Sequence, residues 1–174
     1  LIDLGVHMID LAIYLMGNPK AVAVSGCTYQ KFADNTDKAD SVNADFGEKK
    51  DDGTFDVEDL AIGFIRFENG ASLQIEFSWA SNIEREKTFI ELRGTEKGFT
   101  WQGGHYDVFD AGKHTRGLRR WLDIARQMKG ALHPHGRNLQ HFIDVIERRA
   151  EPDFTPDQGV NLIRILCAMY ETAE

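Results

Sequence analysis

The stretch that decides the fold stands first in the chain, residues 1–17, with the sequence LIDLGVHMIDLAIYLMG. Four of its apolar residues recur at intervals of three and four, which is the spacing of one helix face: Val6, Ile9, Ile13 and Met16. Gly17 and the following Asn18-Pro19 predict the end of this helix, because glycine adopts the left-handed conformation and proline cannot continue a helix.

Three ionisable residues stand at the start of the helix. Asp3, His7 and Asp10 are four and three residues apart, so their side chains share one side of the helix. Three roles remain open. Asp3 caps the helix while His7 is a packed or solvent-edge histidine. Alternatively the pair belongs to a metal site, although two ligands are too few and no third is evident. The third role is acid–base chemistry, in which a carboxylate one turn away holds the imidazole's tautomer.

Strand-like patterns follow this helix. The expected strands are residues 21–32, 55–68, 71–80, 87–94 and 98–102, with a short one at 105–109. Asn69-Gly70 predicts a type I′ hairpin turn, which needs positive φ at both central residues, and Gly63 suggests a close approach within its strand. Strands joined by tight turns favour an antiparallel meander over a βαβ sheet.

The strand at 71–80 alternates between two kinds of side chain. Leu73, Ile75, Phe77 and Trp79 face one way, and Ser72, Gln74, Glu76 and Ser78 face the other. We therefore expect a half-buried strand whose polar face is available to water, a ligand or a partner sheet.

The rest of the chain predicts one polar loop and three helices. The loop covers residues 33–54, and the helices cover 118–129, 138–149 and 156–171, the last beginning with Pro156 at its first position. The last helix is expected to bury one stripe: Val160, Ile163, Leu166, Cys167 and Tyr170. His133-Pro134-His135-Gly136 reads as a loop. The fold class is thus α+β, a largely antiparallel open β-sheet with helices packed on one face.

Composition narrows the possible functions. At 174 residues, with 42% hydrophobic and 28% charged residues, the chain suits a single domain. A net charge of −8 argues against a nucleic-acid or anionic-membrane surface, and no run of 18 apolar residues predicts a transmembrane helix. Cys27 and Cys167 are expected to be buried thiols of a cytoplasmic protein, and a disulfide between them is the alternative that the sequence leaves open.

Several motifs, taken in order, resemble one known family. They are Asp3-x-Gly5-x-His7-x-x-Asp10 followed by Gly17, Val57-Glu58-Asp59-Leu60-Ala61, the hairpin 67–73, the turn Glu91–Gly98, and the closing helices. This arrangement resembles the C-terminal domain of the Gfo/Idh/MocA family, the relatives of glucose–fructose oxidoreductase and inositol dehydrogenase. The resemblance covers nearly the whole chain.

The resemblance implies a function and a set of site residues. The chain would be the substrate-binding and dimerisation half of an NAD(P)-dependent oxidoreductase acting on a sugar, polyol or related hydroxyl or carbonyl compound. In such a reaction a hydride leaves carbon for the nicotinamide as the hydroxyl proton is removed. His7 would accept or donate that proton, Asp3 would orient His7 or bind a second hydroxyl, and Asp10 would be structural.

The resemblance also implies a missing part. NAD or NADP would be bound mainly by an N-terminal Rossmann domain that carries the glycine-rich loop and the lysine of a Glu-Lys-Pro motif, and the chain contains neither. We therefore expect residues 1–174 to be a C-terminal fragment that is inactive alone and holds no cofactor or metal.

A module without catalysis is the alternative. Its task would be to join copies into a homodimer or homotetramer through the sheet face of Ser72, Gln74, Glu76 and Ser78, or to bind a ligand there. The sequence does not distinguish NAD from NADP, name the substrate or fix the net reaction. It also assigns no role to the loop 33–54 or to four histidines: His105, His114, His133 and His135.

Overall fold

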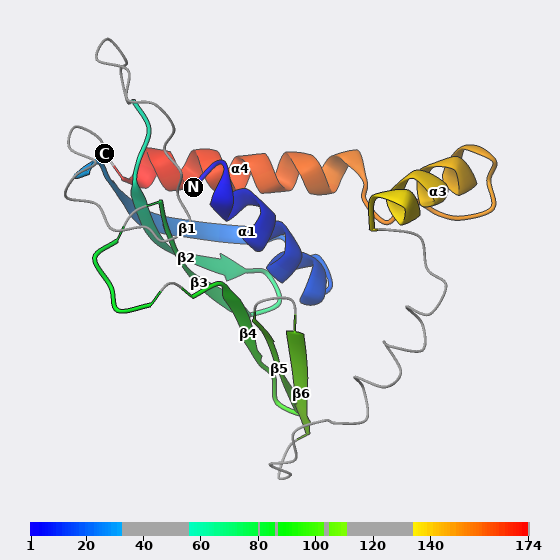
Figure 1. Cartoon of the computed structure of the whole chain (residues 1–174), viewed down its shortest axis with the longest axis horizontal. Helices are drawn as coiled ribbons and strands as arrows, with labels where there is room; N and C mark the ends of the chain where they lie inside the picture. The colour runs from blue at the N-terminus through cyan, green and yellow to red at the C-terminus, as the bar shows by residue number, and fades with distance from the viewer. Residues whose placement is uncertain (33–55, 80, 86, 103–104, 111–133, 174) are drawn as a thin grey trace. The chain divides into compact units, whose positions relative to one another are not determined.

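The computed structural model describes residues 1–32, 56–79, 81–85, 87–102, 105–110 and 134–173 (Figure 1). Their elements are α1 (Leu4–Leu15), β1 (Ala21–Tyr29), β2 (Leu60–Phe67), β3 (Ser72–Ser78), β4 (Phe89–Arg93), β5 (Lys97–Gln102), β6 (His105–Asp110), α3 (Pro134–Ile146) and α4 (Pro156–Thr172). The chain divides into two compact units, residues 1–86 with 156–174, and residues 87–155.

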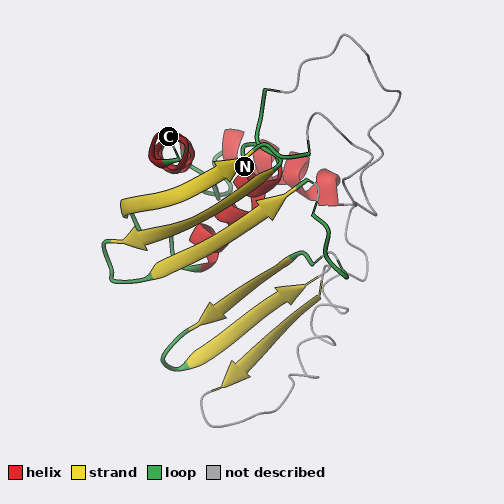
Figure 2. Cartoon of the chain, turned by 90° about the vertical axis from the view of Figure 1, so that its left-hand side faces the viewer, coloured by secondary structure: helices red, strands yellow, loops and turns green. Residues whose placement is uncertain are grey.

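Every strand pair that the structure describes is antiparallel. The first unit contains a sheet of order β1-β2-β3, and the second contains a sheet of order β4-β5-β6 (Figure 2). The predicted α+β class with open antiparallel sheets is confirmed. The sequence predicted one antiparallel meander, whereas the strands form two separate three-stranded sheets.

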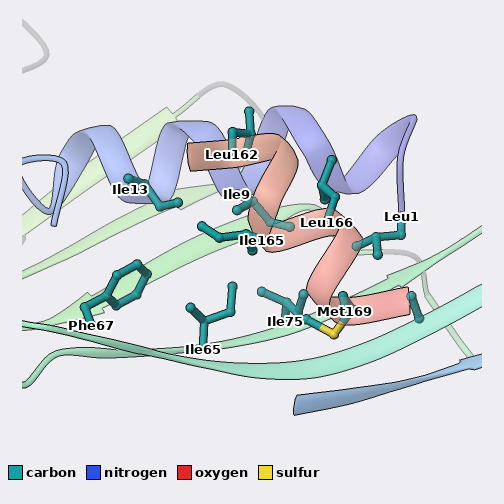
Figure 3. Close-up of a cluster of buried hydrophobic side chains, with 11 residues drawn as sticks. Leu1, Ile9, Ile13, Ile65, Phe67, Ile75, Leu162, Ile165, Leu166 and Met169 are labelled. Carbon is teal, nitrogen blue, oxygen red and sulfur yellow. The ribbon is translucent and has the colours of Figure 1, made fainter. Parts of the chain in front are cut away.

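The core of the first unit lies between one face of its sheet and two helices. α1 contacts β3 and α4, and α4 contacts β1. Figure 3 shows Ile9 and Ile13 of α1 together with Ile165 and Leu166 of α4, above Ile65 of β2. The predicted face of α1 is confirmed, since Ile9 and Ile13 are buried and both Val6 and Met16 pack against the same cluster.

A methionine packs against two glycines at the centre of this core. Gly26 and Gly63 are directly opposite each other in β1 and β2. A Cβ atom at either position would overlap the side chain of Met169, which is fully buried. The close approach predicted at Gly63 is therefore confirmed, because the Met169 side chain occupies the space that a Cβ atom would need.

The hairpin between β2 and β3 differs from the predicted type I′ turn. Gly70 has φ +85°, but Asn69 is not among the residues with positive φ. The amide of Gly70 donates to the Phe67 carbonyl (3.0 Å), and the amide of Phe67 donates to the Ala71 carbonyl (2.9 Å). The loop thus has three residues with glycine in the left-handed position, which is the next commonest way to join two strands.

Two helices start or face differently from the prediction. α3 begins at Pro134, so Pro134–Gly136 lie in its first turn and the predicted loop is wrong there; proline is favoured at the first position of a helix. α4 buries Leu162, Ile165, Leu166 and Met169. Val160 and Ile163, which were expected on the buried stripe, are about half exposed (47% and 52%). α4 has two apolar stripes, and the one containing Met169 faces the sheet.

The two thiols and the start of β2 also differ from expectation. Cys27 and Cys167 are both exposed, so the prediction of buried thiols is wrong; Cys27 lies on the face of the sheet opposite the helices. β2 begins at Leu60 rather than at residue 55, because Glu58 and Asp59 are used in other contacts. The loop 33–54, the helix 118–129, His114 and His133 lie outside the described residues.

Candidate active site

Asp3, His7 and Asp10 lie along one side of α1, whose other side is fixed in the core. Asp3 and His7 are exposed and Asp10 is half-buried, whereas Ile9, Ala12 and Ile13 of the same helix are buried. Within the described part of the chain, no hydrogen bond or ion pair involves any of the three polar side chains. The structure therefore presents a carboxylate and an imidazole on a helix that cannot easily turn.

The structure can be compared with two of the roles left open for Asp3 and His7, helix capping and metal binding. Asp3 occupies the N-cap position of α1, but its side chain makes no capping hydrogen bond. No group of three or more His, Cys, Asp or Glu side chains among the described residues could hold a metal ion. Asp10, which was expected to be structural, makes no side-chain hydrogen bond to another described residue.

Tyr14 extends the same row and was missed in the sequence. It stands seven residues after His7, which returns it to nearly the same side of the helix, and its side chain is 54% exposed. The spacing of positions 3, 7, 10 and 14 could have identified it. A phenol on this row could pack against a ring-shaped ligand or hydrogen-bond to it.

A buried acid behind the start of α1 was also missed. Glu58 is 8% exposed, its Oε1 contacts the backbone nitrogen of Leu1, and its Oε2 accepts the Tyr170 hydroxyl (2.9 Å). Burial raises the pKa of Glu58, whereas the hydrogen bond from Tyr170 lowers it.

Tyr170 completes this cluster from α4. Burial and then the Glu58 carboxylate raise the pKa of Tyr170 to about 12. The phenol is therefore protonated at physiological pH and donates to Glu58.

The neighbouring Asp59 fixes a different segment. It is 3% exposed, and its Oδ2 accepts the backbone amides of Lys31 and Phe32, each at 2.6 Å. Its own backbone links β1 to the end of β3, since its amide donates to Tyr29 and its carbonyl accepts from Trp79 (both 2.9 Å). The signal in the sequence was the Glu58-Asp59 pair directly before an apolar strand, an uncommon place for two acids.

The described residues do not form a dinucleotide site. Such a site places a glycine-rich turn between a parallel strand and a helix N-terminus. Here every described strand pair is antiparallel, and neither α1 nor α4 follows a strand through a glycine-rich turn. None of these described elements therefore forms the strand, glycine-rich turn and helix unit that is typical of a dinucleotide site.

The face of the β1-β2-β3 sheet opposite the helices is partly apolar. Ile62 and Phe64 of β2 are exposed there, between Ser25 and Cys27 of β1 and the polar residues of β3. A shallow hollow is lined by Ser25, Gly26, Cys27, Tyr29, Ile62, Gly63, Phe64 and Gln74. The predicted polar row of β3 is confirmed as outward-facing, since Ser72, Gln74 and Glu76 are exposed. No helix among the described residues has the length and apolarity needed to cross a membrane.

Comparison with known proteins places these features in a family. The chain is 30% identical over 175 residues to D-glucoside 3-dehydrogenase of Escherichia coli (strain K12). The aligned region covers 100% of this chain and 46% of that protein. It is 31% identical over 100 residues to a putative UDP-kanosamine synthase oxidoreductase subunit of Amycolatopsis mediterranei (strain S699), covering 55% of this chain and 26% of that protein.

Solved structures show the same fold. A levoglucosan dehydrogenase in complex with NADH and levoglucosan superposes with a TM-score of 0.68 at 20% identity, over 98% of this chain and 47% of that one. The WlbA dehydrogenase of Bordetella pertussis, in complex with NADH and UDP-GlcNAcA, superposes with a TM-score of 0.66 at 17% identity. The superposition covers 97% of this chain and 44% of that one.

The chain spans less than half the length of these relatives. Residues 1–174 match the family described as the oxidoreductase family, C-terminal alpha/beta domain. The chain therefore belongs to this Gfo/Idh/MocA oxidoreductase family, as its C-terminal domain.

Proposed function

We propose that the chain is the substrate-binding half of an NAD(P)-dependent oxidoreductase that acts on a sugar, polyol or related hydroxyl or carbonyl compound. One observation carries the proposal. Asp3 and His7 are exposed, and neither side chain is bonded to another described residue, on a helix whose opposite face is buried, in a chain of this oxidoreductase family. A carboxylate and an imidazole one turn apart on such a helix are available to a ligand.

D-glucosides are the first substrates to test. The relative that is similar over the whole chain is a D-glucoside 3-dehydrogenase, at 30% identity. The solved levoglucosan and UDP-sugar dehydrogenases are 20% and 17% identical and support the fold alone, so their ligands form a second set for the screen.

His7 would move the proton of the reaction. Oxidation of an alcohol removes a hydride from carbon and a proton from oxygen, and the residues described here serve only the proton. A neutral His7 would accept the hydroxyl proton at a free imidazole nitrogen and return it in the reverse direction. Asp3 makes no bond to His7 in this structure, which favours its second predicted role, accepting a hydrogen bond from a neighbouring hydroxyl of the sugar. Asp10 would remain structural.

The dinucleotide would be bound by a separate Rossmann domain of the complete enzyme. This proposal is supported by the antiparallel sheets described above and by relatives more than twice as long as this chain. A fluorescence titration with NADH and NADPH tests it: the complete enzyme is expected to bind one of them and residues 1–174 alone neither. Tight binding by residues 1–174 would refute the assignment of the cofactor to another domain.

Replacement of His7 tests the catalytic proposal. In the complete enzyme, with methyl β-D-glucoside and NAD⁺ or NADP⁺, His7→Ala should lower kcat by ~10²–10⁴, the usual contribution of a general acid or base. Because His7 is exposed, thermal unfolding should change little. His141→Ala is a matched control, since it removes an imidazole from α3, where it contacts Asp153. A His7→Ala enzyme within twofold of the parent would refute the role of His7.

Self-association through the β1-β2-β3 sheet is a second function with its own support. Ile62, Phe64 and Val22 are 38%, 46% and 62% exposed on or beside one sheet face, a location where isolated domains rarely keep several large apolar side chains. A second copy could cover them and form a homodimer or homotetramer. Phe64→Glu should then lower the mass measured by sedimentation. Ile163→Glu, which places the same charge on the exposed side of α4, should leave it unchanged. Equal masses for the parent and Phe64→Glu would refute this function.

A further inference from the structure

We infer that Tyr14 forms a second part of the substrate site and binds the group attached to the reacting sugar, so that the enzyme prefers glycosides with a ring at that position. The inference rests on the proposed function, in which Asp3 and His7 meet the sugar that is oxidised. Tyr14 then determines specificity and takes no part in proton transfer.

The outward face of α1 exposes few side chains. Of the 12 residues Leu4–Leu15, only Leu4, His7 and Tyr14 are exposed, and Tyr14 is 54% exposed. Ile9 and Ile13 point from the opposite side of the helix into the core (Figure 3). After its first residue, α1 therefore exposes one imidazole and one phenol.

This face does not have the composition of a helix face that meets only water. Such faces normally carry several charged residues. α1 contains no lysine, arginine or glutamate, and its one acid, Asp10, is half-buried. The hydroxyl of Tyr14 has no hydrogen-bond partner among the described residues. Both the ring and the hydroxyl of Tyr14 are therefore available to a ligand.

The spacing of His7 and Tyr14 sets the length of a ligand that contacts both. Seven residues are close to two helical turns, so the two Cα atoms lie ~10 Å apart along one side of the helix. Aromatic and other long side chains on a helix lean toward its N-terminus, so both side chains lean the same way and their tips stay about as far apart. One pyranose ring is too short to span this distance. A sugar at His7 therefore reaches Tyr14 only through a further group.

A second ring is the group that suits Tyr14. The tyrosine side chain offers a large, rigid apolar surface together with a polar hydroxyl. The D-glucosides proposed above carry a substituent on the anomeric oxygen, and this substituent projects away from the sugar ring. An aryl group or a second sugar at this place could pack on the Tyr14 ring, whereas a methyl group would leave the ring uncovered.

Tyr14→Ala in the complete enzyme is the test, with phenyl and methyl D-glucosides of the anomer that the parent oxidises. In the parent, KM should be lower for the phenyl than for the methyl glucoside. Tyr14→Ala should raise KM for the phenyl glucoside about fivefold, the size expected for one lost aromatic contact, and should change KM for the methyl glucoside by less than about twofold. kcat should stay nearly constant for both, because a contact made equally with the substrate and with the transition state changes KM alone.

Two control variants show whether the ring at this position is responsible. Tyr14→Phe keeps the ring and should resemble the parent with both glucosides. Phe154→Ala removes a ring of nearly the same exposure (53%) from the segment between α3 and α4, and it should also resemble the parent. Thermal unfolding of Tyr14→Ala should change little, since the Tyr14 side chain is exposed and alanine favours a helix.

Three results would overturn the inference. The first is an equal change of KM for the two glucosides in Tyr14→Ala; together with a lower unfolding temperature, it would show that another part of the enzyme covers Tyr14. The second is a Tyr14→Phe enzyme that has the KM values of Tyr14→Ala, since the ring would then not be the binding group. The third is a parent enzyme that oxidises the phenyl glucoside of neither anomer.

The two proposals fail in different ways. If His7→Ala keeps its turnover, the proposed function is wrong. If His7→Ala loses turnover while Tyr14→Ala keeps the KM values of the parent for both glucosides, the function stands and the specificity role of Tyr14 is wrong.

Discussion

The contact of Met169 with Gly26 and Gly63 gives a prediction whose size can be worked from the structure. A Cβ at Gly26 would overlap the Met169 sulfur and stand 2.8 Å from the Ile62 carbonyl oxygen of the neighbouring strand. A Cβ at Gly63 would also overlap the end of Met169, but its nearest backbone atom is the Ser25 oxygen at 3.1 Å. Backbone in a sheet moves less readily than the end of a methionine.

The two alanine substitutions should therefore differ. Overpacking a core lowers the unfolding free energy by ~1–3 kcal/mol. Replacing glycine by alanine within a strand raises it by roughly 0.5–1 kcal/mol, because glycine loses more conformational entropy on folding. Gly26→Ala, which meets backbone, should lose about 2 kcal/mol of unfolding free energy. Gly63→Ala, which meets a flexible side chain, should lose about 1 kcal/mol or less.

A double-mutant cycle identifies Met169 as the cause. Met169→Ala alone should cost ~2–5 kcal/mol, because Met169 is fully buried. Combined with Gly63→Ala it should cost less than the sum of the single changes, by about 1 kcal/mol, since the added methyl then enters the vacated space. Urea unfolding followed by circular dichroism measures all four proteins. Costs that add within about 0.5 kcal/mol would refute the overlap argument.

Substitutions at Gly70 and Asp59 test other parts of the fold. Gly70→Ala should cost about 1–2 kcal/mol, because Gly70 has φ +85° and alanine is strained in that region; an unchanged urea midpoint would contradict the turn. Asp59→Ala should cost about 2–4 kcal/mol, because two backbone amides lose a charged acceptor, and Asp59→Asn should cost less; equal losses would argue against these bonds.

Much of the first unit could be predicted because its signals are local. The face of α1 follows from a helical period within residues 1–17, and its end follows from Gly17, which has φ +83°. The alternation in β3 indicated both its buried and its exposed face. Each of these patterns arises from residues a few positions apart. It could therefore be recognised without knowing which distant segments pack together.

The errors concern features that depend on contacts with residues far along the chain. Both stripes of α4 are apolar, and only contact with β1 and β2 shows that Met169 and Ile165 face inward while Ile163 does not. The buried thiols were inferred from residue type, whereas Cys27 is outward because its strand alternates in register with Ile62. The division into two sheets likewise depends on which strands pair, and single-strand patterns do not contain that information.

The candidate site repeats this distinction at a smaller scale. Asp3 and His7 could be found from the sequence because they stand one helical turn apart, and that spacing is visible within residues 3–7. Glu58 and Tyr170 are 112 residues apart, and neither segment indicates that the two side chains bond to each other. They meet only because α4 packs back against the sheet. A pair within one helical turn can therefore be found from the sequence, whereas a pair joined across 112 residues is visible only once the fold is known.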